Sequence, residues 1–194
     1  MDAGVTLIVR TARLTLREPR SGARVVMGWP LSLGERWLFL ALIAVMSALL
    51  AELLLALSPQ GADTAMVALL SSPITFAGLQ FAALGILTGL LFFLGLPFGG
   101  KGRFGEALAL VGWLQTLLLA LQIAQIVAMV IFPVLGVLIV AVGLVMTLWL
   151  LTNFTAELHQ FQSLAWTLFG IIAAFVALVV GLSVGIIMIA GVRV

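Results

Sequence analysis

The chain has 194 residues, of which 64% are hydrophobic and only 8% are charged, and its formal net charge is +2. A soluble domain carries about 25% charged residues, and a soluble chain this small could not bury so much apolar surface. The composition therefore excludes an ordinary soluble domain and predicts an all-α integral membrane protein. The few basic groups do not describe a nucleic-acid-binding surface, and the lack of cysteine excludes thiolate metal sites and disulfides.

Residues 1–36 form a basic arm whose arginines recur at steps of three and four: Arg10, Arg13, Arg17, Arg20 and Arg24. On a helix this spacing makes one stripe, beside an apolar face that includes Val5, Ile8 and Leu16. Such a segment lies in the interface and contacts anionic lipid headgroups. Pro19 is expected to start a second short helix. Docking to a partner protein is the alternative for the arm.

Five apolar stretches are long enough to cross a hydrocarbon core, which needs about 20 residues. The predicted spans are approximately 37–57, 74–96, 107–131, 134–151 and 164–190. The expected fold is a five-span transmembrane helical bundle with an N-terminal interfacial amphipathic helix. The domains are the arm, 1–36, and the membrane domain, 37–194.

The boundary at Pro133 decides the count of five. As one helix, the uncharged stretch 107–151 would be roughly 68 Å long, far more than a core of about 30 Å. Proline disfavours helix at the preceding residue, Phe132, so a tight turn between two spans is expected. One kinked span with a re-entrant piece is the alternative.

Basic residues set the expected orientation. Arg36 and the five stripe arginines precede the first span, Lys101 and Arg103 lie between the second and third, and Arg193 falls on the other side. This asymmetry of eight to one places the N-terminus in the cytoplasm and the C-terminus outside. A four-span chain would place the C-terminus inside, with little change in the charge count.

Polar side chains inside the spans are candidates for a membrane polar cluster: Glu52, Gln80, Gln115, Gln122 and Gln125. A carboxylate in hydrocarbon must be protonated, paired or near the interface, and glutamine needs a partner there. Hydrogen bonds between helices are the plainer interpretation, and a polar pathway is the alternative. Small residues suited to close helix packing occur as Gly85-xxx-Gly89 and Gly181-xxx-Gly185.

No set of residues indicates an enzyme, and no metal or other cofactor is expected. Glu157 and the single histidine, His159, are expected in a short loop after Asn153. One histidine without a second ligand cluster does not make a metal site. Asp63 and His159 are expected on opposite sides of the membrane, which excludes a Ser-His-Asp set.

The loop after the second span is the most distinctive stretch. It runs from Phe98 through Gly99, Gly100, Lys101, Gly102, Arg103 and Phe104 to Glu106. The glycines permit a tight reversal, Phe104 is an interfacial anchor, and Glu106 suits the start of a helix. This loop, together with the stretch from Trp149 to Phe161 that contains His159, resembles the Yip (Ypt-interacting protein) domain family in its bacterial branch.

The resemblance implies five spans, a cytosolic arm and no catalytic residues. Eukaryotic members act in vesicle trafficking with small Rab-type GTPases, a partner that does not transfer to a short basic arm. We expect a non-enzymatic scaffold or membrane-organising protein of the bacterial cell membrane. Its expected partners are anionic lipids, a second copy or another membrane protein. The alternative is a small transporter, channel or lipid-moving protein using Glu52 and the third-span glutamines.

Overall fold

The computed structural model describes residues 3–57 and 72–191, and these residues fold as helices joined by short turns. Asp63 and Arg193, which were used above, lie outside them. The elements are α1 (Ala3–Arg17), α2 (Pro19–Met27), α3 (Leu33–Leu57), α5 (Pro73–Gly95), the 3₁₀ turn η1 (Leu96–Phe98), α6 (Phe104–Ile131), α7 (Pro133–His159) and α8 (Leu164–Gly191). The predicted all-α fold class is confirmed.

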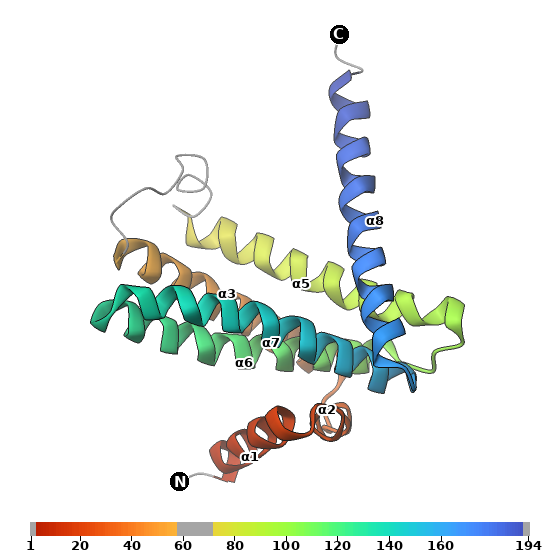
Figure 1. Ribbon diagram of the computed structural model, residues 1–194, viewed down its shortest axis with the longest axis horizontal. Helices are drawn as coiled ribbons and strands as arrows, with labels where there is room; N and C mark the ends of the chain where they lie inside the picture. Colours follow the sequence, from red (N-terminus) through yellow and green to blue (C-terminus); the bar gives the residue numbers. More distant parts are fainter. Residues whose placement is uncertain (1–2, 58–71, 192–194) are drawn as a thin grey trace.

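Five helices, α3, α5, α6, α7 and α8, are long and apolar enough to cross a membrane. Figure 1 shows α3, α5, α6 and α7 running side by side as a bundle. The helix α8 leaves this bundle sharply and contacts α5 and α7. In the most apolar window of α8, none of the residues is buried inside the protein, so this helix requires an apolar solvent around it.

The chain reverses at Phe132, between α6 and α7. Phe132 has extended backbone angles, with φ −152° and ψ 97°, and Pro133 opens α7 at a position where its missing N–H costs nothing. The two helices then pack against each other. The predicted turn is therefore confirmed, and the alternative of one kinked span is wrong.

Two helices begin before their apolar runs because polar residues cap them. The α3 helix begins at Leu33 rather than Trp37, and the Glu35 carboxylate accepts the Ser32 N–H at 2.7 Å. The α6 helix begins at Phe104 rather than Ala107, and the Glu106 carboxylate accepts the Arg103 N–H at 3.0 Å. Both are capping interactions that satisfy N–H groups left free at a helix start.

The fourth predicted span was too short, because α7 continues past Leu151 to His159. Glu157 and His159 are therefore helical and do not lie in a loop. Thr152 and Thr155 each donate a hydroxyl to the carbonyl four residues earlier, so polar side chains here are satisfied by the helix itself. At about 1.5 Å per residue, α6 and α7 each reach roughly 40 Å, about 10 Å longer than a hydrocarbon core.

The arm packs against one end of the bundle. The predicted break at Pro19 is confirmed, since α1 ends at Arg17 and α2 begins at Pro19. The α2 helix contacts α6 and α7, and Figure 1 shows the arm on one side of the bundle and α8 on the other. We call the region where α2, the loop 96–103, the start of α6 and the end of α7 meet the arm-side end.

Candidate functional site

His159 lies at the centre of the arm-side end, in a cradle of glycines. A Cβ atom at Gly95 would lie 2.1 Å from His159 Nδ1, and one at Gly100 would lie 2.3 Å from the same atom. A Cβ at Gly102 would lie 2.6 Å from Leu158 Cγ. Any side chain at these positions would overlap the end of α7, so the glycines are what allow the loop to close over it.

The imidazole of His159 is fixed from two directions. Its side chain is buried, Nε2 lies 2.8 Å from the Leu91 carbonyl oxygen, and the ring stacks on Phe161 with centroids 5.4 Å apart. A carbonyl only accepts, so Nε2 carries a hydrogen and donates it to Leu91. Nδ1 is buried without a hydrogen-bond partner among the described residues. The described residues contain no group of three side chains able to hold a metal ion.

The loop that carries the glycines is itself sharply folded. Gly99 has φ +74°, in the left-handed region that favours glycine, and its N–H donates to the Leu96 carbonyl at 3.2 Å. The Gly100 N–H donates to the Gly95 carbonyl at 2.8 Å. The tight reversal predicted for this loop is thus present. The two sequence stretches that carried the family resemblance contact each other here, although sequence reasoning assigned His159 no partner.

The arm is attached to the end of α7 by two arginines that were expected at lipid headgroups. Arg20 donates to the Phe161 carbonyl at 2.8 Å, and Arg24 pairs with Glu157 at 3.1 Å. The Arg24 side chain is 64% exposed and the Glu157 side chain only 10%. These two members of the stripe therefore bind within the chain, Arg24 to α7 and Arg20 to the turn that follows it. Arg10, Arg13 and Arg17 remain exposed.

Aromatic and hydroxyl groups attach the arm to α6. The indole N–H of Trp113 donates to the Thr15 hydroxyl at 3.0 Å, and Thr15 donates to the Thr11 carbonyl at 2.8 Å. Trp29 packs edge-on against Trp113 with ring centroids 5.4 Å apart. Within the arm, Gly22 allows α2 to lie close against α1, because a Cβ there would lie 2.3 Å from the Thr15 hydroxyl oxygen.

Arg36 holds the connection between arm and bundle. Its guanidinium donates to the backbone carbonyls of Trp29 at 3.1 Å and Met27 at 3.5 Å, and to that of Gly105 on α6. The Nε–H donates to the Leu31 carbonyl at 3.1 Å. From the sequence, Arg36 was predicted only to be a basic residue before the first span. The five fixed donors of arginine suit this role, which a point-charge lysine would not fill.

The exposed half of the arm is amphipathic. Val5, Ile8 and Val9 on α1 have exposed fractions of 49%, 49% and 44%, beside the exposed side chain of Arg10. An exposed apolar and basic helix of this kind matches the surface of an anionic membrane. The predicted headgroup contacts of Arg10, Arg13 and Arg17 stay predictions, as do those of Lys101 and Arg103, which are exposed in the loop before α6.

Among the described residues, no hydrogen bond joins Glu52 to the glutamines of the predicted polar cluster. Gln122 is instead hydrogen-bonded to Ser47 of α3, which donates its hydroxyl to the amide oxygen at 3.3 Å and accepts at its carbonyl at 3.4 Å. Glu52, Gln80, Gln115 and Gln125 are half-buried on their helices. Three cavities in the described part of the chain are lined by other residues. For Gln122, the interpretation as a bond between helices is confirmed.

The structure also places Phe104 and the two predicted glycine packing motifs. Phe104, which was predicted to be an interfacial anchor, packs between Trp37 and Phe92, with centroid distances of 6.1 and 5.8 Å. A Cβ added at Gly85 would lie 3.7 Å from the Trp37 ring, in ordinary contact. A Cβ added at Gly181 or Gly185 would face open space. A Cβ added at Gly89 would meet only Phe93, one turn on in its own helix, at 4.0 Å. Among the described residues, the tightest approaches through glycine are at the arm-side end and not at the predicted motifs.

Together these features define a multi-pass helical membrane protein whose amphipathic arm is docked on one end of the bundle. Residues 14–185 match the Yip1 domain. The chain therefore belongs to the Yip1 domain family, and the resemblance seen in the two loops is confirmed. No curated protein and no solved structure matches the chain.

Proposed function

We propose that this protein organises the membrane around it without catalysing a reaction, as a scaffold in the bacterial cytoplasmic membrane. The observation that carries the proposal is the docked arm. Its inner face binds α6 and α7 through Thr15, Arg20 and Arg24, while its outer part presents arginines and apolar side chains. A helix held rigidly beside a bundle in this way delivers a lipid-binding surface at a fixed place.

Electrostatics support the lipid contact. Each basic residue near an anionic membrane surface contributes about 1 kcal/mol of attraction, and the side chains of Arg10, Arg13 and Arg17 are exposed. Burying Val5, Ile8 and Val9 among the headgroups adds a hydrophobic contribution. The cytoplasmic leaflet is the anionic one, and the arm-side end carries Lys101 and Arg103 as well as the arm. We therefore place the arm-side end in the cytoplasm and the C-terminus outside.

Depth measurements on the arm test the proposal. The chain has no cysteine, so Ile8→Cys gives one labelling site for an environment-sensitive fluorophore in full-length protein reconstituted in vesicles. Lipids with quenchers at known depths should quench this label strongly in anionic vesicles and weakly in neutral ones. Replacing Arg10, Arg13 and Arg17 with Gln should abolish the difference, whereas Lys at the same positions should preserve it. Equal quenching in the Gln variant and the parent would overturn the proposed lipid contact.

The alternative function, as a transporter or channel, requires polar side chains inside the bundle to contact a solute. It needs Glu52 and the α6 glutamines to act on one passing solute, yet Gln122 is bonded to Ser47. Proteoliposomes should therefore show the same ion and lipid movement with Glu52→Gln as with the parent chain. Movement that is lost in Glu52→Gln would replace the scaffold proposal with a transport function.

A further inference from the structure

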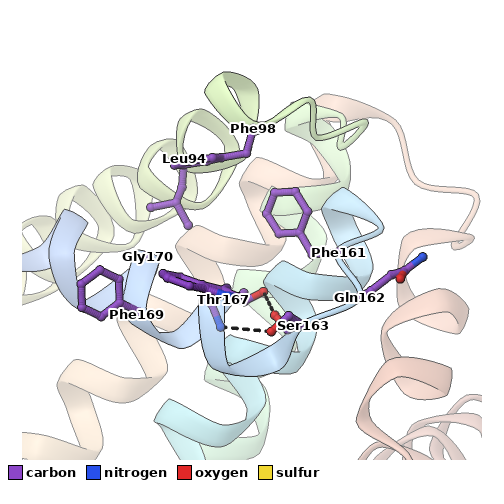
Figure 2. A pocket seen from close by; sticks show the side chains of 9 residues that line it. Leu94, Phe98, Phe161, Gln162, Ser163, Thr167, Phe169 and Gly170 are labelled. Carbon is purple, nitrogen blue, oxygen red and sulfur yellow. Dashed lines mark hydrogen bonds between the residues drawn. The ribbon is translucent and has the colours of Figure 1, made fainter.

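An aromatic groove lies between the end of α5 and the start of α8. It has a volume of about 510 Å³ and is lined chiefly by Leu94, Phe98, Phe161, Trp166 and Phe169. Figure 2 shows Leu94 and Phe98 toward the top of the view, Phe169 and Gly170 at the left, and the Phe161 ring to the right of Leu94. Phe98 is 73% exposed and Trp166 is 75% exposed. So much exposed aromatic surface at one end of a membrane bundle calls for an apolar occupant.

One rim of the groove is polar, and Arg20, which does not itself line the groove, lies next to it. Gln162 and Ser163 follow Phe161 in the lining, and the Phe161 carbonyl accepts the hydrogen bond from Arg20. Thr167 and Ser163 are already engaged, because the Thr167 hydroxyl donates to the Ser163 carbonyl at 2.8 Å. Arg20 has five N–H donors and uses one of them on Phe161. The remaining donors, with the exposed Gln162 amide, offer a site for an anion beside an apolar trough.

We propose that this groove binds one anionic glycerophospholipid, with an acyl chain against the aromatic side chains and the phosphate at Arg20. The groove lies where α5 ends and α8 begins, so hydrocarbon and headgroups meet beside it. Its volume is within the range of small-molecule sites, about 300–1,000 Å³. An apolar trough with a cationic side chain beside it matches an amphiphile with a negative headgroup better than a wholly apolar or a wholly polar ligand. This inference deepens the proposed lipid contact and uses residues other than Arg10, Arg13 and Arg17.

The chain offers a matched pair of substitutions. A Cβ added at Gly170 would lie 3.8 Å from Leu94 Cδ2, in ordinary contact, so a side chain can start there without a clash, and Gly170→Leu should fill the groove. Gly181 on the same helix faces open space, which makes Gly181→Leu the control. Trp166→Gln removes one apolar wall at an exposed position and serves as a second variant if Gly170→Leu does not purify as a single species.

Native mass spectrometry of the delipidated full chain, titrated with phosphatidylglycerol or with phosphatidylcholine of the same acyl chains, tests the proposal. The parent should bind one phosphatidylglycerol in preference. Gly170→Leu and Trp166→Gln should weaken that binding and Gly181→Leu should not. Arg20→Gln should lower the preference by about tenfold, as expected for one charge-assisted hydrogen bond, and Arg20→Lys should retain most of it.

Equal affinity of the parent for the two lipids, or equal phosphatidylglycerol binding by the Gly170→Leu and Gly181→Leu variants, would overturn the lipid site. The depth of the Ile8 label separates this failure from that of the proposed function. It should be the same in Gly170→Leu as in the parent, because α1 contributes nothing to the groove lining. Loss of quenching at the Ile8 label with normal phosphatidylglycerol binding would overturn the proposed lipid contact of the arm and leave the groove site intact.

Discussion

Replacing Gly95 with alanine should disrupt the contact on which the arm-side end is built. The new methyl group would lie 2.1 Å from His159 Nδ1 and 2.2 Å from Cε1, far closer than atoms approach without displacement. The imidazole cannot simply rotate away, because Nε2 is bonded to the Leu91 carbonyl and the ring is stacked on Phe161. Either the ring or the end of α5 must move.

The cost of this change can be worked from its parts. Overpacking a filled site costs about 1–3 kcal/mol, and losing a buried hydrogen bond costs about 0.5–1.5 kcal/mol. Removing a helical glycine recovers roughly 0.5–1 kcal/mol. We therefore expect Gly95→Ala to lower the free energy of unfolding by about 1–3 kcal/mol. Gly181→Ala, which meets open space, should be neutral or slightly stabilising.

Unfolding of the purified chain in mixed micelles, followed by circular dichroism as the mole fraction of a denaturing detergent rises, measures these differences. His159→Ala removes the ring that the new methyl group strikes, so the double variant should be more stable than the sum of the two single changes predicts, by at least about 1 kcal/mol. The close contact between Gly95 and His159 would be refuted if Gly95→Ala were as stable as Gly181→Ala. It would also be refuted if the stability changes of the two single variants simply added in the double variant.

Three further predictions concern the contacts between elements, and the same unfolding measurement checks them. Arg36→Ala should cost about 2–4 kcal/mol, since it removes hydrogen bonds from a charged group to several carbonyls; a loss below about 1 kcal/mol would contradict the role of Arg36 as a clamp. Trp113→Phe should cost about 1 kcal/mol by deleting the bond to Thr15 while keeping the ring, and full stability would show that this bond is unimportant. Gln122→Leu should cost only about 0.6 kcal/mol, the average for a bond between helices in a membrane, and unchanged vesicle permeability should accompany it.

Local signals explain why much of the fold could be predicted. Membrane residence follows from the composition, and the spans follow from apolar runs of sufficient length. Pro19 and Pro133 act on their own backbone and that of the preceding residue, so both helix boundaries could be located without knowing what lies nearby. The family resemblance was equally local, being carried by two short stretches.

The end of α7 could not be predicted in the same way. Hydropathy records where apolar residues stop, whereas a helix stops where its backbone loses partners. Thr152, Asn153 and Thr155 ended the apolar run, yet each bonds to the carbonyl four residues earlier and is buried at the arm-side end. These side chains are buried where α7 packs against α2 and the start of α6. Both segments are distant in sequence, so the residues around Thr152 do not predict this burial.

The sequence by itself determined that the protein resides in a membrane, which segments are helical and where most helices begin and end. These properties depend on the side chains of each segment alone. Only the tertiary structure decided what the polar residues do. It joined Arg24 to Glu157, and Gln122 to Ser47 rather than to Glu52. It also showed that Gly95 and Gly100 are small because His159, some sixty residues away in the chain, occupies the space beside them. Such contacts depend on packing between helices, and spacing along one helix does not encode them.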